Sequence, residues 1–524
     1  MVAPALSPAA VRAAATPDAG ALPPVAACEA ARRSRDVRFD GLFFTAVHST
    51  RIYCRPVCPA PFARRVSYYA NAAAAEAAGY RPCLRCRPEL APGDSTWRRG
   101  DAALARALTL VDAGALADMP LAALATRVGI GERQLRRLFA QRIGAAPHSV
   151  HGTRRLLFAK QLLAETAMPV TEVAMSSGFG SLRRFNDAFQ AAYRMAPRDL
   201  RRLPASARPA DRDVPTLRLG YRPPYDFDAM LAFARAHVLP GVEVVDATSY
   251  ARTIAGADGV ASGWLRVDAW PGAHALRLRW HAPAGARLLP AVARLRRMFD
   301  LDANPDAIAA VLSSDPRLAP LLRVRPGLRL PGGWDGFEIA VRAVVGQQVS
   351  VAAACTFATR LAQGFGESLP ADVRSVAPAG LSHLFPTPAA LADADLAAIG
   401  VTRARADTLR AVSRALLDGG VDFAVERTLA DQVTRWTAVP GIGPWTAHYI
   451  AMRALAHPDA FPADDLVLQQ AVAATAGEDR THAGRTTARA LAARAEAWRP
   501  WRAYAALHLW RDARPPAAAG DRRP

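Results

Sequence analysis

Two closely spaced cysteine pairs near the N-terminus constrain the fold of this chain more than any other feature. The stretch "STRIYCRPVCPAPFARR" places three residues between Cys54 and Cys58, and "YRPCLRCRP" places two between Cys83 and Cys86. Both spacings suit a closed tetrahedral site in which four thiolates bind one Zn²⁺ ion. We therefore predict a small domain folded around zinc. Cysteines scattered through a core are the alternative.

Arginines surround these cysteines, at Arg51, Arg55, Arg64, Arg65, Arg81, Arg85 and Arg87. They can offset the formal charge of roughly −2 that four thiolates place around Zn²⁺. Zinc keeps the sulfurs deprotonated at neutral pH, and a thiolate is the nucleophilic form of cysteine. A nucleophilic sulfur beside DNA could accept an alkyl group, and the lost negative charge would improve the fit to phosphate. A purely structural zinc site is the alternative.

The charge of the chain points to nucleic acid as a partner. The chain has 524 residues and a net charge of +20, and Lys160 is its only lysine. This length allows three or four domains, and the excess of basic residues favours a polyanionic partner. The longest charge-free run of interest, 343–359, is shorter than the roughly 20 residues of a membrane span. We find no secretory signal, so we expect a cytoplasmic protein without a membrane partner.

Composition and periodicity divide the chain into seven segments. We predict a disordered tail at 1–30, a metal-dependent unit at 31–96, a helical unit at 100–203, a linker at 204–215, an α+β unit at 216–330, a helical unit at 331–513 and a tail at 514–524. The α+β unit contains strand-like alternation in "VEVVDATSYARTI", "GWLRVDAW" and "HALRLRWHA", followed by the helical stretch "LLPAVARLRRMFDLD".

The first helical unit shows two helix-turn-helix patterns. In "PLAALATRVGIGERQLRRLFAQRIG" a turn at Gly129 precedes a basic helix. In "VTEVAMSSGFGSLRRFNDAFQAAYRMAP" the turn falls at Gly178, and Arg183 and Arg184 begin the second helix. Two such helices could enter successive major grooves of double-stranded DNA, with these arginines in contact with it. An ordinary helical bundle with a basic face is the alternative.

The second helical unit contains a Pro-Gly-x-Gly turn followed by an aspartate. In "VPGIGPWTAHYIA" the turn includes Gly441 and Gly443, and free N–H groups at the start of the next helix could bind a phosphate. Asp465 follows sixteen residues after Tyr449, in "FPADDLVLQQ". Plain helix capping is the alternative role for Asp464 and Asp465, and we expect it for one of them.

These motifs carry resemblances to known families. "RFDGLFFTAVHSTRIYCRPVCPA" with "GYRPCLRCRPE" resembles the N-terminal zinc domain of the adaptive-response regulator Ada, and "GFGSLRRFNDAFQAAYRMAPRDLR" resembles an AraC-type DNA-binding domain. "RAVVGQQVSVAAA", "VPGIGPWTAHYIAMRAL" and "RPWRAYAALHLW" resemble the AlkA-like 3-methyladenine glycosylases of the helix-hairpin-helix superfamily. The implied architecture is a small zinc-bound α+β domain, an all-α double helix-turn-helix, a TBP-like α+β domain and an all-α glycosylase domain.

The resemblances also imply roles for single residues. They make Cys54 the acceptor of a methyl group from methylphosphotriesters, with Cys58, Cys83 and Cys86 as the other zinc ligands. They make Asp465 the catalytic carboxylate, with Trp445 and Tyr449 in the base pocket and Gly441 and Gly443 at the DNA. The family's intercalating leucine falls at Gln348, so the residue that fills the vacated base stack is changed. The implied partners are alkylated DNA, promoter DNA and RNA polymerase, on the nucleoid.

The chemistry of the residues agrees with a glycosylase that only hydrolyses. An N-alkylated purine is a cationic leaving group, which aromatic faces can hold while a carboxylate stabilises the cationic sugar. A Schiff-base lyase is excluded because Trp445 takes the place of the superfamily's hairpin lysine and residues 331–513 contain no lysine. There is no cysteine cluster for an iron–sulfur centre, and we expect Cys355 to be a buried helix residue.

Two alternative functions remain open. One is a regulator whose glycosylase half only binds DNA, and the other is a glycosylase whose N-terminal parts only add non-specific affinity. No "PCHRV"-like motif is present, so an O6-alkylguanine transferase domain is not expected.

Overall fold

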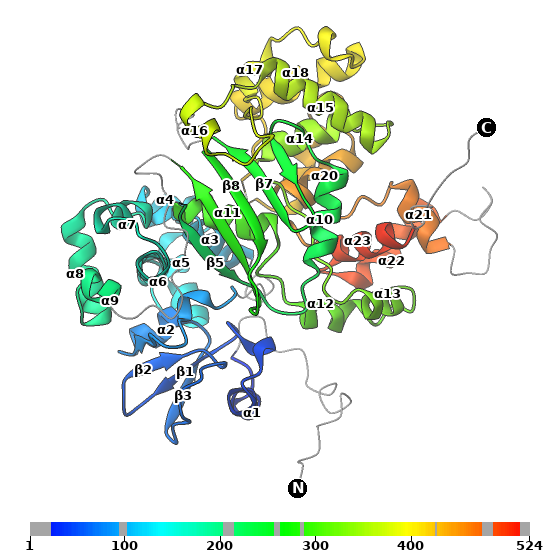
Figure 1. Cartoon of the computed structure of the whole chain (residues 1–524). Helices are drawn as coiled ribbons and strands as arrows, with labels where there is room; N and C mark the ends of the chain where they lie inside the picture. The colour runs from blue at the N-terminus through cyan, green and yellow to red at the C-terminus, as the bar shows by residue number, and fades with distance from the viewer. Residues whose placement is uncertain are drawn as a thin grey trace.

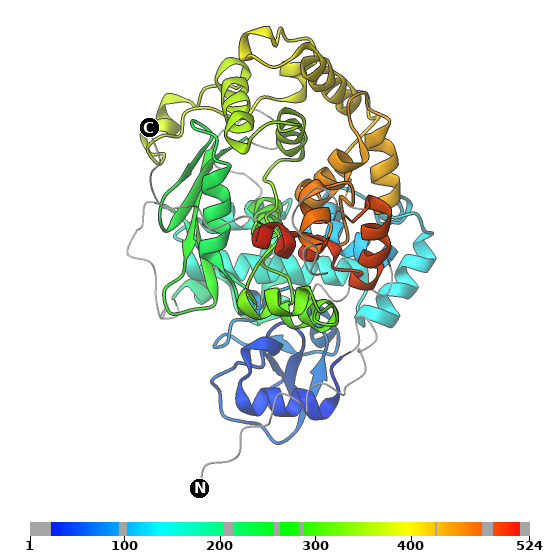
Figure 2. The ribbon, with the colours of Figure 1, turned by 90° about the vertical axis from the view of Figure 1, so that its right-hand side faces the viewer.

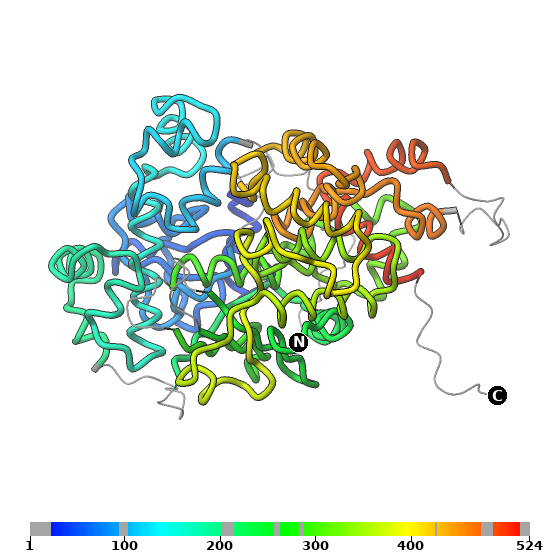
Figure 3. Tube along the Cα trace, turned by 90° about the horizontal axis from the view of Figure 1, so that it is seen from above, coloured from blue at the N-terminus to red at the C-terminus, as the bar shows by residue number. Residues whose placement is uncertain are grey.

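A computed structural model describes residues 22–93, 102–202, 214–255, 263–282, 288–424, 427–473 and 486–513. The predicted C-terminal tail, most of the predicted linker and residues 1–21 of the predicted N-terminal tail lie outside these ranges. The zinc unit lies at the lower left of Figure 1, with the helix-turn-helix unit above it and the C-terminal helices at the top and right. Viewed from above in Figure 3, the two N-terminal units (residues 22–202) and the last helices occupy opposite sides of the molecule.

The N-terminal unit is a four-stranded sheet with two helices. Its elements are α1 (Val25–Ser34), β1 (Phe44–Val47), β2 (Ile52–Cys54), β3 (Val66–Tyr69), α2 (Ala72–Ala77) and β4 (Arg81–Pro82). The strand order is β3-β1-β2-β4, and only the β2–β4 pair is parallel. Helix α1 begins at Val25, so folded structure starts inside the segment predicted as a tail. Buried Cys28 and Ala31 hold this helix against Phe43.

The second unit contains only helices among its described residues. They are α3 (Ala102–Asp112), α4 (Leu121–Arg127), α5 (Glu132–Leu138), α6 (Pro147–Glu165), α7 (Val170–Ser176), α8 (Leu182–Tyr193) and α9 (Pro197–Arg202). Gly129 and Gly178 have φ angles of 80° and 81° at the two predicted turns. This left-handed conformation is readily adopted by glycine. The long helix α6 connects the two helix-turn-helix units, which confirms the predicted arrangement.

The α+β unit is an antiparallel sheet with helices beside it. It contains β5 (Thr216–Gly220), α10 (Phe227–Ala236), β6 (Glu243–Val245), β7 (Ser249–Ile254), β8 (Gly263–Ala269), β9 (Ala275–His281) and α11 (Leu288–Met298). The strand order is β5-β9-β8-β7-β6. Buried side chains of this sheet, such as Leu219 and Val267, share one hydrophobic core with Phe185 and Phe189 of α8. The α+β unit and the helix-turn-helix unit therefore pack against each other.

The C-terminal helices form an arc that is visible in Figure 2. They are α12 (Pro305–Leu312), α13 (Leu318–Val324), α14 (Gly336–Val345), α15 (Val351–Phe365), α16 (Ala371–Ser375), α17 (Pro388–Ala392), α18 (Arg403–Leu417), α19 (Leu429–Thr437), α20 (Pro444–Ala454), α21 (Leu466–Ala473), α22 (Ala488–Ala495) and α23 (Arg502–Ala513). Ile308 and Leu321 share a core with Phe461 and Trp498, so the predicted boundary at residue 330 divides this core. None of the described helices is long and apolar enough to cross a membrane.

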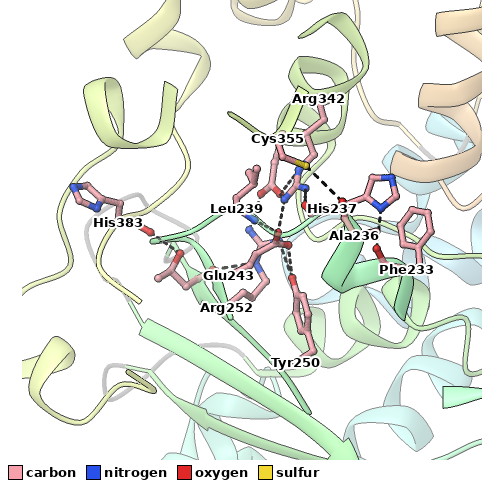
Figure 4. A network of polar contacts seen from close by, with 12 residues as sticks. Phe233, Ala236, His237, Leu239, Glu243, Tyr250, Arg252, Arg342, Cys355 and His383 are labelled. Carbon is pink, nitrogen blue, oxygen red and sulfur yellow. Dashed lines mark hydrogen bonds and ion pairs between the residues drawn. The ribbon is translucent and has the colours of Figure 1, made fainter. Parts of the chain in front are cut away.

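A buried polar network joins the sheet to α14 (Figure 4). In Figure 4, Glu243 accepts hydrogen bonds from Arg342 at 2.7 Å and from the Tyr250 hydroxyl at 2.6 Å. Arg252 also pairs with Glu338 at 2.6 Å. Burial raises the pKa of the Glu338 carboxyl, but Arg252 and Arg342 outweigh it and hold that pKa at about 2. Removing one partner would leave an uncompensated buried charge, so the network fixes α14 on the sheet.

Cys355 belongs to α15 and faces this network in Figure 4. It is only partly buried, so the expectation of a buried residue is wrong. Its thiol donates a weak hydrogen bond to the carbonyl oxygen of Ala236 at 3.8 Å.

Helix α6 connects the zinc unit with the edge of the five-stranded sheet. Lys160, with 2% of its side chain exposed, pairs at 2.5 Å with Glu89, whose side chain is 1% exposed. At the edge strand β5, Gln161 donates to the Arg218 carbonyl at 2.7 Å and Glu165 accepts from the Arg218 amide at 2.9 Å. These two side chains satisfy backbone groups that an edge strand otherwise leaves unpaired.

Candidate zinc centre and candidate base-excision pocket

The four predicted cysteine ligands come together at one point. The sulfur atoms of Cys54, Cys58, Cys83 and Cys86 all lie within 4.8 Å of one another, and all four residues are buried. Sulfurs bound to one Zn²⁺ at about 2.3 Å stand roughly 3.8 Å apart in a tetrahedron, so the cluster fits this ion. Strand β2 ends at Cys54 and pairs with β4, which leads into Cys83.

Burial does not single out one sulfur as the reactive one. Cys54 and Cys58 are each 9% exposed, and Cys83 and Cys86 are each 7% exposed. The backbone N–H of Arg55 donates to the sulfur of Cys86 at 3.3 Å. The assignment of Cys54 as the methyl acceptor therefore still depends on the resemblance.

The arginines around the cysteines serve different purposes. Arg55 pairs with Asp40, and Arg87 pairs with Glu165 at 2.6 Å and Glu89 at 3.0 Å, so these two arginines hold the fold. Three others, Arg64, Arg65 and Arg85, are exposed and make no ion pair with the described residues. Only some of the seven arginines predicted around the cysteines are therefore available to a DNA phosphate.

In the second helix-turn-helix unit, Arg183 and Arg184 both lie exposed at the start of α8. Ser181 caps this helix by accepting a hydrogen bond from the Arg184 N–H at 3.2 Å. The side chains predicted to contact DNA are therefore free to do so on the outer face of the helix.

Asp465 is held by two tryptophans from distant parts of the chain. The indole N–H of Trp445, on α20, donates to Oδ2 at 2.8 Å, and that of Trp510, on α23, donates to Oδ1 at 3.1 Å. Trp510 belongs to the family-like stretch "RPWRAYAALHLW", but nothing in that stretch predicts its contact with Asp465. Trp510 and Asp465 are 45 positions apart, so no local sequence pattern predicts this hydrogen bond.

The same aspartate caps helix α21. The N–H of Leu468 donates to Oδ1 of Asp465 at 2.9 Å, whereas Asp464 is exposed and makes no capping bond. The sequence predicts a capping role for one of the two aspartates. The structure gives the cap to the proposed catalytic residue, because the helix begins at Leu466, immediately after it.

The loop before Asp465 is fixed by α20 and α23. Asp459 accepts hydrogen bonds from Arg502 at 2.8 and 2.9 Å, and the Phe461 N–H donates to the His448 ring at 3.3 Å. Burial lowers the pKa of His448, and the charge of Arg502 lowers it further. A neutral ring can accept this bond, so His448 holds the loop in place.

Trp445 and Tyr449 stack directly on each other. Their ring centroids are 5.2 Å apart with an interplanar angle of 11°. A base inserted between two rings needs a gap of roughly 7 Å, or two van der Waals contacts, so a base can stack only on an outer face of this pair. Arg453 donates to the Tyr449 hydroxyl at 2.8 Å and keeps that ring in place.

The hairpin between α19 and α20 is tightly packed at one glycine and open at the other. Gly441 has a φ of 86°, and a Cβ atom there would lie 2.0 Å from Oγ1 of Thr408. Gly443 begins α20 without a side-chain cap, and a Cβ atom added to it would meet no other atom within 4 Å. This open helix start can accept a backbone phosphate. Gln348 lies in the turn between α14 and α15, with its side chain exposed.

Family comparisons cover all four folded units. The chain matches the metal binding domain of Ada at 27–89, a helix-turn-helix domain at 124–203, the AlkA N-terminal domain at 216–335 and the HhH-GPD superfamily of base excision DNA repair proteins at 341–500.

Individual relatives cover the same units. The chain is 38% identical to a probable bifunctional transcriptional activator/DNA repair enzyme AlkA of Mycobacterium tuberculosis, over 92% of this chain and 95% of that protein. It is 35% identical to DNA-3-methyladenine glycosylase 2 of Escherichia coli, over 56% of this chain and 95% of that one. A solved 3-methyladenine DNA glycosylase from Archaeoglobus fulgidus aligns with a TM-score of 0.47 at 21% identity, over 56% of this chain and 97% of that one. The 38% identity to the Mycobacterium tuberculosis protein and the HhH-GPD match show that the chain belongs to the family of bifunctional transcriptional activator and DNA repair enzymes of the AlkA type, and that its C-terminal part is a helix-hairpin-helix DNA glycosylase.

Proposed function

We propose that the C-terminal half removes N-alkylated purines of the 3-methyladenine type from double-stranded DNA by hydrolysis. The observation that supports this most is the Asp465 carboxylate, whose two oxygens accept hydrogen bonds from Trp445 and Trp510 beside a stacked aromatic pair. Donors on both oxygens orient the carboxylate before substrate binds. Such preorganisation is what stabilises a developing charge effectively.

The bond changes follow from this arrangement. The extruded, positively charged purine stacks on the outer face of the Trp445–Tyr449 pair. The glycosidic bond breaks, and its electron pair leaves with the base, which becomes neutral. The Asp465 carboxylate faces the cationic sugar and takes a proton from the water molecule whose oxygen bonds to the anomeric carbon.

The test compares two neighbouring aspartates. Asp465→Asn retains a good helix cap and one hydrogen-bond acceptor but removes the negative charge. We expect single-turnover release of 7-methylguanine to fall by about a thousand-fold or more, while affinity for a tetrahydrofuran abasic duplex changes little. Asp464→Asn, whose parent side chain is exposed, should remain close to wild type. Equal losses in the two variants, or no release by the wild type, would contradict the proposal. The second result would favour a regulator that only binds DNA.

We also propose that Cys54 accepts a methyl group from methylphosphotriesters in DNA. The support is the buried cluster of four sulfurs beside exposed arginines. A Zn²⁺ ion held by Cys54, Cys58, Cys83 and Cys86 would keep their sulfurs deprotonated at neutral pH. The Cys54 sulfur forms a bond to the methyl carbon, the carbon–oxygen bond of the triester breaks, and its electrons stay on the phosphate oxygen. The thiolate loses its charge, which reduces repulsion of the DNA backbone.

The consequence that we propose is activation of transcription at promoter DNA, with RNA polymerase as partner and a location on the nucleoid.

The test of the Cys54 proposal is transfer of a labelled methyl group from DNA to the protein. Cys54→Ala should abolish transfer, whereas Cys58→Ala should mainly disrupt the zinc unit. A promoter footprint that does not change after methylation would overturn the regulatory part alone.

A further inference from the structure

Two histidine rings hold the loop that leads from α20 to Asp465. The ring Nδ1 of His448, on α20, accepts a hydrogen bond from the Phe461 N–H at 3.3 Å. The ring Nδ1 of His457, just beyond the end of that helix, accepts one from the Asp459 N–H at 3.2 Å. A backbone N–H is the donor in both bonds, so each ring carries its single proton on Nε2 and leaves Nδ1 bare.

The helices on either side fix the frame in which these two bonds form. The His457 N–H donates to the Ala451 carbonyl at 3.1 Å and closes the end of α20. The Ala503 N–H, in the first turn of α23, donates to the Pro458 carbonyl at 2.9 Å. The loop therefore starts from a fixed point, and the bond to His448 holds it again four residues before Asp465.

Charged groups of the loop and of the segment that leads into α23 act on the two rings. They are Asp459, Asp464, Arg499 and Arg502. Burial and the charge of Arg502 outweigh the aspartates, so the pKa of His448 is lowered. Burial likewise lowers the pKa of His457 to about 4, and a charge on His448 would lower it further. Both rings are therefore neutral at pH 7.

Protonation would turn each acceptor into a donor. A proton on Nδ1 would face the backbone N–H, and the hydrogen bond would be lost. Because the folded protein binds the neutral rings, both bonds are present at neutral pH and are lost as the pH falls through the lowered pKa values. The segment that loses its support is the one that carries Asp465, and misplacing a reacting group by about 1 Å can cost roughly a hundred-fold in rate.

Building on the proposed excision, we propose that His448 and His457 are positioning residues, which hold the Asp465 carboxylate in its productive place only while both rings are uncharged. They act through the loop and not on the substrate. The two rings therefore set the acid limit of base release.

The first test separates the acceptor atom from the rest of the ring. Asparagine can place an oxygen near the position of Nδ1 and does not titrate, whereas leucine has a similar size and offers no acceptor. At neutral pH, His448→Asn should release 7-methylguanine in a single turnover at close to the wild-type rate. His448→Leu should be slower by roughly five- to fifty-fold. Affinity for a tetrahydrofuran abasic duplex should change by less than about two-fold in both variants.

The second test is the pH profile of base release, corrected for release from the same duplex without protein. At about pH 4.5, the double variant His448→Asn/His457→Asn should keep at least about two-fold more of its neutral-pH rate than the wild type does. The matched control His274→Asn makes the same change at an exposed position between β8 and β9, and it should follow the wild-type profile.

Hydrogen exchange of residues 458–465 gives a readout that needs no turnover. His448→Leu should speed exchange there, and His448→Asn should not. Equal rates of base release for these two variants, or a wild-type pH profile in the double variant, would overturn the positioning role even if 7-methylguanine is released normally. A wild type that releases no base, in which exchange still depends on the acceptor, would contradict the excision chemistry and support the hold on the loop.

Discussion

The zinc centre and the site around Asp465 hold their reactive groups in opposite ways. The four cysteines come from one short segment and are all buried, since none is more than 9% exposed. Asp465 is only partly buried, and its partners come from α20, α21 and α23. The zinc unit needs a metal ion to offset the negative charge of four clustered thiolates. The Asp465 carboxylate, in contrast, is oriented by hydrogen bonds from the folded helices. Loss of the metal should therefore unfold the whole zinc unit, whereas loss of one contact to Asp465 should lower activity only in part.

Removing zinc should give the largest effect. Metal binding contributes about 10–16 kcal/mol to the folding of small zinc domains, so a chelator should unfold residues 22–93. Hydrogen exchange of the full chain should show lost protection in β1–β3 and unchanged protection in α20 and α21. If β1–β3 stay protected in the metal-free protein, the zinc unit does not depend on its metal for folding.

Lys160→Met should have the next largest effect, because it leaves Glu89 buried without its closest cation. Breaking a buried ion pair costs about 3–5 kcal/mol, and the remaining bond from Arg87 should place this loss near the lower value. The opening free energy of α6 by hydrogen exchange measures it. Arg154→Met removes an exposed cation from the same helix and should cost less than about 1 kcal/mol. Similar losses in the two variants would show that the buried pair does not stabilise the junction.

Trp510→Phe tests whether the loss of one contact at the Asp465 site lowers activity only in part. It keeps an aromatic ring but removes one indole donor to Asp465, and a hydrogen bond to a charged group is worth about 1.5–3 kcal/mol. We expect single-turnover base release to fall roughly ten- to hundred-fold. Trp498→Phe removes an indole donor to Asp315 instead and should leave the rate unchanged. A rate unaffected by Trp510→Phe would mean that Trp445 and the Leu468 N–H are enough to orient the carboxylate.

The smallest effect should come from an exposed arginine of the zinc unit. Arg85→Gln should leave the fold intact, weaken promoter binding a few-fold and reduce the slope of log affinity against log salt by about one. Arg87→Gln, by contrast, should reduce stability because Arg87 pairs with buried Glu165 and Glu89. Binding titrations at several salt concentrations together with melting curves distinguish the two. An unchanged salt slope for Arg85→Gln would remove this arginine from the DNA surface.

Local patterns were sufficient for much of the architecture. The cysteine spacing predicted the cluster that the structure assembles, and the turns at Gly129 and Gly178 predicted the helix-turn-helix units, because each pattern lies within one short segment. The stretch "FPADDLVLQQ" could not show which aspartate caps α21, since both precede the helix and only the position of its first turn decides. The same limit applies to Cys355, whose burial depends on helices from other units.

The sequence by itself determined the chemistry that this protein carries: four thiols at metal-binding spacing, basic recognition helices, a hairpin glycine pair and an aspartate after it. Only the tertiary structure decided how those groups are held. It placed Trp510 against Asp465, packed α6 between the zinc unit and strand β5, and joined the turn after α14 to the hairpin through hydrogen bonds from the Gln347 side chain to Gly441 and Thr446. These contacts join residues far apart in the chain, and their geometry is set by the packing of helices and strands, which local spacing does not encode.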